Sequence, residues 1–142
     1  MTVRSIGLVG LTVFLTACTS AAPVKVTTGD QCFRCRRTIT DDRTAGEMVQ
    51  GTFVSKFKAP GCMAKYLVDH PDERGTLFVT DYNSGKLIAP ERAYFVPLTV
   101  NVATGERDYR AFRDAAAASS AAADLKTNTV LDWKTVLERA RS

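Results

Sequence analysis

Short stretches rich in β-branched and aromatic residues, separated by polar and glycine-containing turns, predict strands along the middle of this chain. The clearest turns are Gln50-Gly51 and Asn83-Ser84-Gly85-Lys86, and each of them joins two such stretches. The first of these turns predicts a hairpin. In chain order, the predicted strands span residues 47–49, 52–57, 77–82, 86–88 and 93–100.

Other stretches carry apolar residues at the spacing of a helix. Met63, Tyr66 and Leu67 predict a short helix over residues 62–68 that ends before Pro71. The alanine-rich stretch from residue 108 to residue 125 predicts a longer helix.

The same spacing places Tyr109, Phe112 and Ala116 on one face of that longer helix. Asp132 is a suitable N-cap for a last helix through Ala140. Strands, a helix, more strands and further helices then follow one another in the chain. We therefore expect an α+β fold, a small single domain of two ββα-like halves.

The beginning of the chain is typical of a bacterial targeting segment. Residues 6–15 are apolar, follow a single charge at Arg4 and are too few to span a bilayer. Leu15-Thr16-Ala17-Cys18 then fits a lipobox, in which the cysteine is lipidated and becomes the new amino terminus. The alternative is an ordinary signal peptide that is cleaved near Ala17 or Ala22.

These observations divide the chain into three parts. Residues 1–17 are the expected lipoprotein signal peptide, residues 18–30 the lipidated cysteine with a flexible tether, and residues 31–142 the folded domain. Lipid on Cys18 is the expected membrane anchor. We therefore expect the protein in the cell envelope, on the extracytoplasmic side of a bacterial membrane.

The charge of the chain says little about its partners. Its net charge of +4 comes from scattered residues, and the only basic cluster is Arg34, Arg36 and Arg37. Aromatic and basic residues do not alternate as they do in many nucleic-acid-binding proteins. The chain also has no phosphate-binding glycine loop and no nucleophile elbow. We expect no nucleic-acid partner, no small-molecule substrate and no enzymatic activity.

Three cysteines remain once Cys18 is lipidated. They are Cys32 and Cys35, which form a C-x-x-C pair, and Cys62 at the start of the first predicted helix. Two cysteines with this spacing suit a disulfide, zinc or copper(I). A fold that pairs the two strands between residues 47 and 57 could bring all three sulfurs into one pocket.

The donors available favour copper(I) over zinc. A closed zinc site takes four ligands, which here would require the three cysteines and His70. Copper(I) accepts two or three sulfur ligands, thioethers included, so Met63 or Met48 could complete a cysteine site. We therefore expect metal ligands at Cys32, Cys35, Cys62 and Met63, and this requires Cys62 to lie within about 10 Å of the C-x-x-C pair.

Two other functions remain open at this stage. A thiol-disulfide oxidoreductase would use Cys32 and Cys35, whose thiolates the neighbouring arginines would favour. Such enzymes, however, place the pair after a strand and at the start of a helix, whereas here it lies between the tether and a polar loop. The other alternative is a lipoprotein interaction module with a structural disulfide.

Several segments together resemble the NosL family, lipoproteins associated with copper delivery to nitrous oxide reductase. They are the lipobox cysteine, the C-x-x-C pair and residues 61–67, 78–85, 88–96 and 110–112. The resemblance implies an α+β fold of two ββα-like halves and an extracytoplasmic copper(I) metallochaperone with a copper donor or acceptor protein as partner. Members of the family tend to have Gly-Met after the second cysteine, where this chain has Arg36-Arg37.

Overall fold

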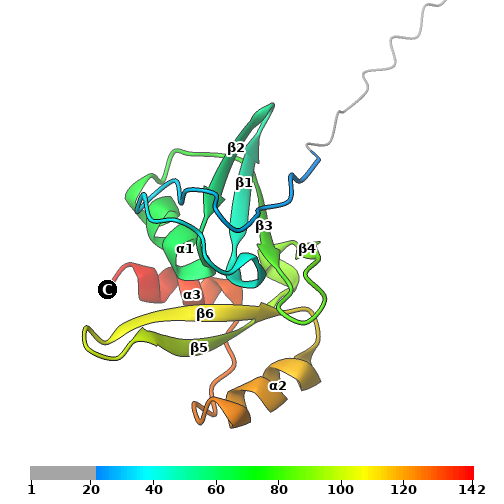
Figure 1. Cartoon of the computed structure of the whole chain (residues 1–142), viewed down its shortest axis with the longest axis vertical. Helices are drawn as coiled ribbons and strands as arrows, with labels where there is room; N and C mark the ends of the chain where they lie inside the picture. The colour runs from blue at the N-terminus through cyan, green and yellow to red at the C-terminus, as the bar shows by residue number, and fades with distance from the viewer. Residues whose placement is uncertain (1–21) are drawn as a thin grey trace, which may run out of the picture.

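The computed structural model describes residues 22–142 (Figure 1). The predicted signal peptide and the predicted lipidation of Cys18 lie outside these residues. The chain forms a small α+β domain with two antiparallel sheets, which confirms the predicted fold class. Within the described range, no helix combines the length and the apolar character needed to cross a membrane.

The larger sheet has four strands in the order β2-β1-β3-β4, all antiparallel. The predicted hairpin is present, with Val49 paired to Val54 across the turn. A short 3-10 helix, η1, precedes β1, and a second, η2, follows β4. The bounds are Asp42–Thr44 for η1, Gly46–Gln50 for β1, Phe53–Phe57 for β2, Thr76–Thr80 for β3, Leu87–Ile88 for β4 and Pro90–Arg92 for η2.

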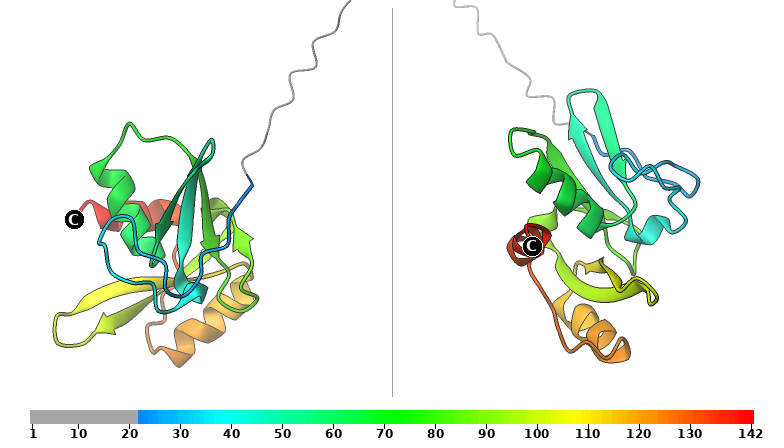
Figure 2. Two further views of the ribbon diagram at one scale, coloured as in Figure 1. Left: turned by 45° about the horizontal axis from the view of Figure 1, so that its top comes forward. Right: turned by 90° about the vertical axis from the view of Figure 1, so that its left-hand side faces the viewer.

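Helix α1 (Pro60–Asp69) packs on one face of this sheet, as the right-hand view of Figure 2 shows. The thioether of Met63 reaches β1, where its Sδ lies 3.6 Å from the position a Cβ would occupy on Gly46. A larger residue than glycine at position 46 would also come within 2.9 Å of the Phe78 carbonyl. The close approach of helix and sheet therefore depends on glycine at this position.

The opposite face of the sheet is covered by the segment that precedes η1 (Figure 2). Val26 is only 2% exposed, and the Val24 N–H donates to the carboxylate of Glu47 on β1 at 2.8 Å. The Lys56 ammonium on β2 pairs with Asp30 at 2.7 Å. From Val24 onward, the segment predicted as a tether therefore belongs to the fold, and any flexible tether has to end before it.

The second sheet pairs β5 (Tyr94–Asn101) with β6 (Glu106–Phe112), and α2 (Ala115–Asp124) lies beneath it in Figure 1. The prediction of one helix over residues 108–125 was therefore wrong in its first part. Pairing with β5 outweighs the local helical preference there, and the helix begins only after Asp114, whose carboxylate caps the Ala117 N–H at 2.9 Å.

The last helix, α3 (Trp133–Ala140), begins where the sequence predicts, because Asp132 accepts a hydrogen bond from the Thr135 N–H at 2.8 Å. It packs against α1, and its Trp133 ring lies 5.5 Å from that of Phe95 on β5. The described residues therefore contain the order ββα twice, with β3 and β4 between the two units in the sequence. Helix α3 follows both units and contacts each of them, through α1 of the first and β5 of the second.

Candidate metal centre

The C-x-x-C pair lies on a tight loop with its own hydrogen bonds. The Cys32 N–H donates to the Arg37 carbonyl, and the Arg36 N–H donates back to the Cys32 carbonyl, each at 2.9 Å. Arg36 closes the loop with a φ of 60°, in the left-handed region that favours glycine. The Phe33 N–H then donates at 2.7 Å to the Lys56 carbonyl, which holds the loop against the open edge of β2.

The third cysteine is positioned by the first turn of α1. Cys62 is the third helical residue, after Pro60 and Gly61, and the preceding Ala59 has no side chain that could cap the helix. The cap comes instead from Asp108 on β6, whose Oδ1 accepts from the Gly61 N–H at 2.8 Å. The residue that fixes the start of this helix was not identified from the sequence, because it lies 47 residues away.

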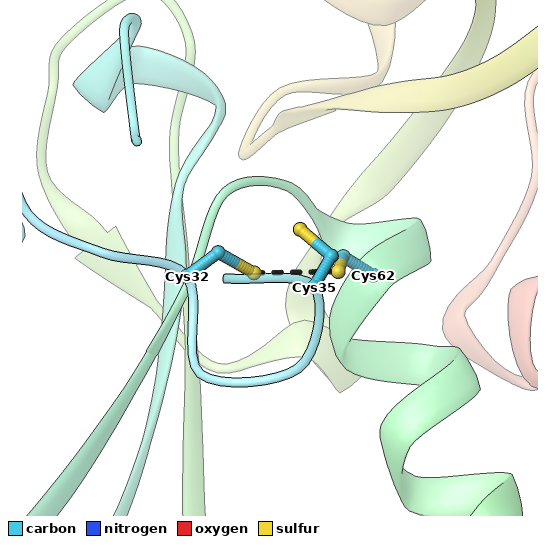
Figure 3. A group of neighbouring side chains, drawn as sticks. All are labelled: Cys32, Cys35 and Cys62. Atoms are coloured by element: carbon cyan, nitrogen blue, oxygen red, sulfur yellow. Dashed lines mark hydrogen bonds between the residues drawn. The ribbon is translucent and has the colours of Figure 1, made fainter. Parts of the chain in front are cut away.

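The loop and the helix bring three sulfur atoms together (Figure 3). The Sγ atoms of Cys32, Cys35 and Cys62 all lie within 4.8 Å of one another, and those of Cys32 and Cys62 are 3.4 Å apart. An ion with metal–sulfur bonds of about 2.3 Å would hold three thiolates roughly 4 Å apart. The cluster could therefore hold a metal ion with shifts of less than about 1 Å.

The other predicted donors face different surroundings. Met63 points at Gly46 on the sheet, and Met48 is fully buried on β1. His70 forms the C-cap of α1, and its backbone N–H and Nδ1 both lie 2.9 Å from the Tyr66 carbonyl. His70 follows Cys62 by eight positions, which corresponds to about 12 Å along a helix. The structure thus joins the three cysteines and does not join His70 to them.

A hydrogen bond joins the sulfurs of Cys32 and Cys62. The hydrogen bond between Cys62 and Cys32 lowers the pKa of Cys32, helped by the N–H groups of Cys35 and Lys58, although burial opposes this effect. The same hydrogen bond, together with burial, raises the pKa of Cys62. This direction favours the thiolate of Cys32 over its thiol, and thiolate is the form that binds metal.

All three cysteines are free thiols, and they differ in access to water. Cys32 and Cys62 are buried, whereas Cys35 is half-buried. Behind the loop, the rings of Phe33, Phe57 and Tyr66 pack at centroid distances of 5.4 to 6.3 Å. A bound ion would be approached from the side of Cys35.

That side opens into a cleft of about 670 Å³ between α1, α3 and the β5–β6 hairpin. Cys35 and Cys62 both line it. Glu106 organises part of its wall, because it pairs with Arg37 at 3.2 Å and with Lys58 at 3.0 Å. These pairs keep the cations of Arg37 and Lys58 beside the thiols, and Glu106 balances part of their positive charge.

The chain matches no family model, no curated protein and no solved structure. The resemblance to the NosL family therefore rests on the segments of sequence named above.

Proposed function

We propose that this protein is a membrane-anchored, extracytoplasmic accessory protein that binds copper(I) and passes it to another protein. The observation that carries the proposal is the convergence of Cys32, Cys35 and Cys62, whose sulfurs all lie within 4.8 Å of one another. Lipidation at Cys18 would supply the anchor.

Copper(I) suits this cluster better than zinc does. A closed zinc site needs a fourth ligand, and the one histidine of the chain lies at the far end of α1. Among residues 22–142, the only group of three or more cysteine, histidine or acidic donors close enough to share an ion is the cysteine trio. Three thiolates alone are a sufficient donor set for copper(I).

The uneven burial of the three cysteines suits transfer. Cys32 and Cys62 would retain the ion in the interior, while the half-buried Cys35 offers a sulfur that an incoming donor can replace. Ligand exchange with the cysteines or methionines of a partner would then move copper without a change in its oxidation state. The resemblance to the NosL family suggests a copper enzyme such as nitrous oxide reductase as the final destination.

One backbone feature adds support to the resemblance. The family tends to have glycine directly after the second cysteine, and Arg36 at this position has a φ of 60°. Glycine adopts that conformation without the steric cost of a Cβ. The left-handed backbone at position 36 thus gives a physical reason for the family's preference for glycine there.

The proposal is tested by an anaerobic titration of the reduced full-length chain in detergent with copper(I), in competition with a chromogenic chelator. We expect stoichiometric binding that is lost in the variant Cys32→Ser/Cys35→Ser and weakened strongly in Cys62→Ser. Cys18→Ser is the matched control, because it removes the expected anchor and leaves the cluster intact. A wild-type chain that fails to compete with the chelator would refute the proposal.

A thiol-disulfide oxidoreductase remains the second candidate, because the sulfurs of Cys32 and Cys62 are only 3.4 Å apart. A disulfide, at about 2.05 Å, would need a modest approach of the two atoms. Reduction of insulin by the wild-type chain, lost in Cys32→Ser/Cys35→Ser while copper affinity stays unchanged, would favour this function. The burial of Cys32 makes direct attack on a protein substrate difficult.

A further inference from the structure

The cleft beside the cysteine cluster is strongly basic. Six cationic side chains line it against two acidic side chains, those of Glu106 and Asp108. The excess of basic over acidic side chains in the cleft equals the net charge of +4 of the complete chain. The fold therefore brings together basic residues that are scattered in the sequence. The six are Arg34, Arg37, Lys58, Lys65, Arg107 and Arg139.

Three of these cations are available to a ligand. Arg34, Arg37 and Lys58 each pair with a carboxylate of the domain. Within residues 22–142, no carboxylate lies at ion-pair distance from Lys65, Arg107 or Arg139, and all three side chains are exposed. They come from α1, β6 and α3, so cations from three separate elements face one space.

This arrangement disfavours the approach of a bare copper(I) ion, which would meet like charges at the entrance. It favours an anion. The volume of about 670 Å³ is within the range of small-molecule sites and far larger than an ion requires. The sulfurs of Cys35 and Cys62 line the same cleft, so a thiol bound there would lie beside the metal ligands.

We propose that the cleft binds a low-molecular-weight thiol that carries carboxylates, which brings copper(I) to the cysteine cluster as an anionic complex. The carboxylates lie on Lys65, Arg107 and Arg139, and the sulfur faces Cys35 and Cys62. The inference rests on the proposed function, and it departs from the sequence-based expectation of no small-molecule substrate.

The transfer balances without an oxidant or a reductant. Each copper–sulfur bond to the carrier that breaks is replaced by one to a cysteine of the protein. The proton of that cysteine thiol passes to the departing carrier thiolate, and copper remains in the +1 state. The half-buried Cys35 is the first protein sulfur within reach from the cleft.

Calorimetric titration of the pre-reduced, metal-free full-length chain with glutathione, under nitrogen and at low salt, tests the carboxylate site separately from copper. S-methylglutathione, which has no free thiol, should bind the metal-free chain equally well, because the carboxylates carry this binding. Cysteamine, a thiol without carboxylates, should not bind. Binding should weaken as salt is raised.

The variant Lys65→Ala/Arg107→Ala/Arg139→Ala should weaken glutathione binding at least about tenfold, since charge-assisted hydrogen bonds are lost. Lys86→Ala/Arg92→Ala is the matched control, because it removes two exposed cations outside the cleft and should leave binding unchanged. The triple variant should keep its copper(I) affinity against the chelator when no thiol is present.

With copper(I) loaded, glutathione should bind more tightly than S-methylglutathione, since only its sulfur can join the ion. Absence of glutathione binding to the metal-free chain would overturn the inference. Unchanged glutathione binding by the triple variant, or equal binding of cysteamine, would also overturn it. Failure of the proposed function would give a different result: glutathione would bind to the cleft, but the chain would not bind copper(I).

Discussion

A methyl group at Gly61 should have opposite effects on stability in two backgrounds. A Cβ at this position would lie 2.7 Å from Oδ1 of Asp108 and 3.3 Å from the Tyr109 ring. Asp108 cannot move away freely, because the same oxygen accepts from the N–H groups of Gly61 at 2.8 Å and Tyr109 at 2.9 Å. In Gly61→Ala, the added methyl group displaces the Asp108 carboxylate, which then no longer caps α1.

The magnitude follows from two opposing effects. Alanine is favoured over glycine in a helix by about 0.5–1 kcal/mol. Loss of a hydrogen bond to a charged, buried acceptor costs about 1.5–3 kcal/mol. We therefore expect Gly61→Ala to lower the free energy of unfolding by about 1–2 kcal/mol in the wild-type background. In the Asp108→Ala background the carboxylate is absent and only the edge of the Tyr109 ring, at 3.3 Å, has to shift slightly, so the same change should stabilise the fold by up to about 1 kcal/mol.

Urea denaturation of the four chains of this double-mutant cycle, followed by the fluorescence of Trp133, measures both values. The two changes should couple by more than about 1 kcal/mol. Copper(I) affinity should fall in Gly61→Ala and Asp108→Ala, because Cys62 is the residue after the perturbed turn. The same stabilisation by Gly61→Ala in both backgrounds would show that Asp108 does not fix the start of α1.

Three further predictions concern the sheet, the core and the second helix. Burial raises the pKa of Glu47 above its ordinary value of 4.5, so the folded chain holds a proton that the unfolded chain releases. The stability that this protonation contributes is present below pH 4.5 and is lost as the pH rises through the folded-state pKa. Over this range the unfolding free energy of the wild type should fall relative to that of Glu47→Gln, and parallel curves of unfolding free energy against pH for the two chains would contradict the reasoning. Met63→Leu should cost less than about 1.5 kcal/mol and leave copper(I) affinity nearly unchanged in the chelator competition, whereas a tenfold loss would place the thioether in the coordination sphere. Asp114→Ala should lower the unfolding free energy by about 0.5–2 kcal/mol through loss of the Ala117 cap, and Asp114→Asn should retain most of it, both measured by urea denaturation.

The parts of the fold that were predictable are those with a local signal. The turn at Gln50-Gly51 and the spacing of Met63 and Tyr66 specify a hairpin and a helix whatever the rest of the chain does. The convergence of Cys62 with the C-x-x-C pair followed from that hairpin, because the strand that leads into α1 returns beside the loop. The Asp132 cap is equally local.

The parts that escaped prediction depend on distant contacts. The stretch around Tyr109 has residues that are compatible with a helix and becomes a strand because β5 pairs with it. Val26 lies in a stretch of threonine and alanine that is typical of a linker, yet it is only 2% exposed and belongs to the main hydrophobic core. Only Arg34 and Arg37 of the basic cleft form a cluster in the sequence, and its three available cations give no signal because they are 32 or more residues apart. Ala59 has no side chain that could cap α1, and this was the one local indication that another segment supplies the cap.

The cysteine cluster draws its sulfurs from two segments that are 30 residues apart. An ion held by both segments therefore acts as a crosslink between the loop and α1. By mass action, an ion that binds only the folded chain stabilises it by about 1.4 kcal/mol for each tenfold excess of free ion over the dissociation constant. On the proposed function, delivery of copper removes this crosslink, so the empty protein is the form most open to unfolding and proteolysis. Its lifetime in the envelope would then report how much copper the cell supplies.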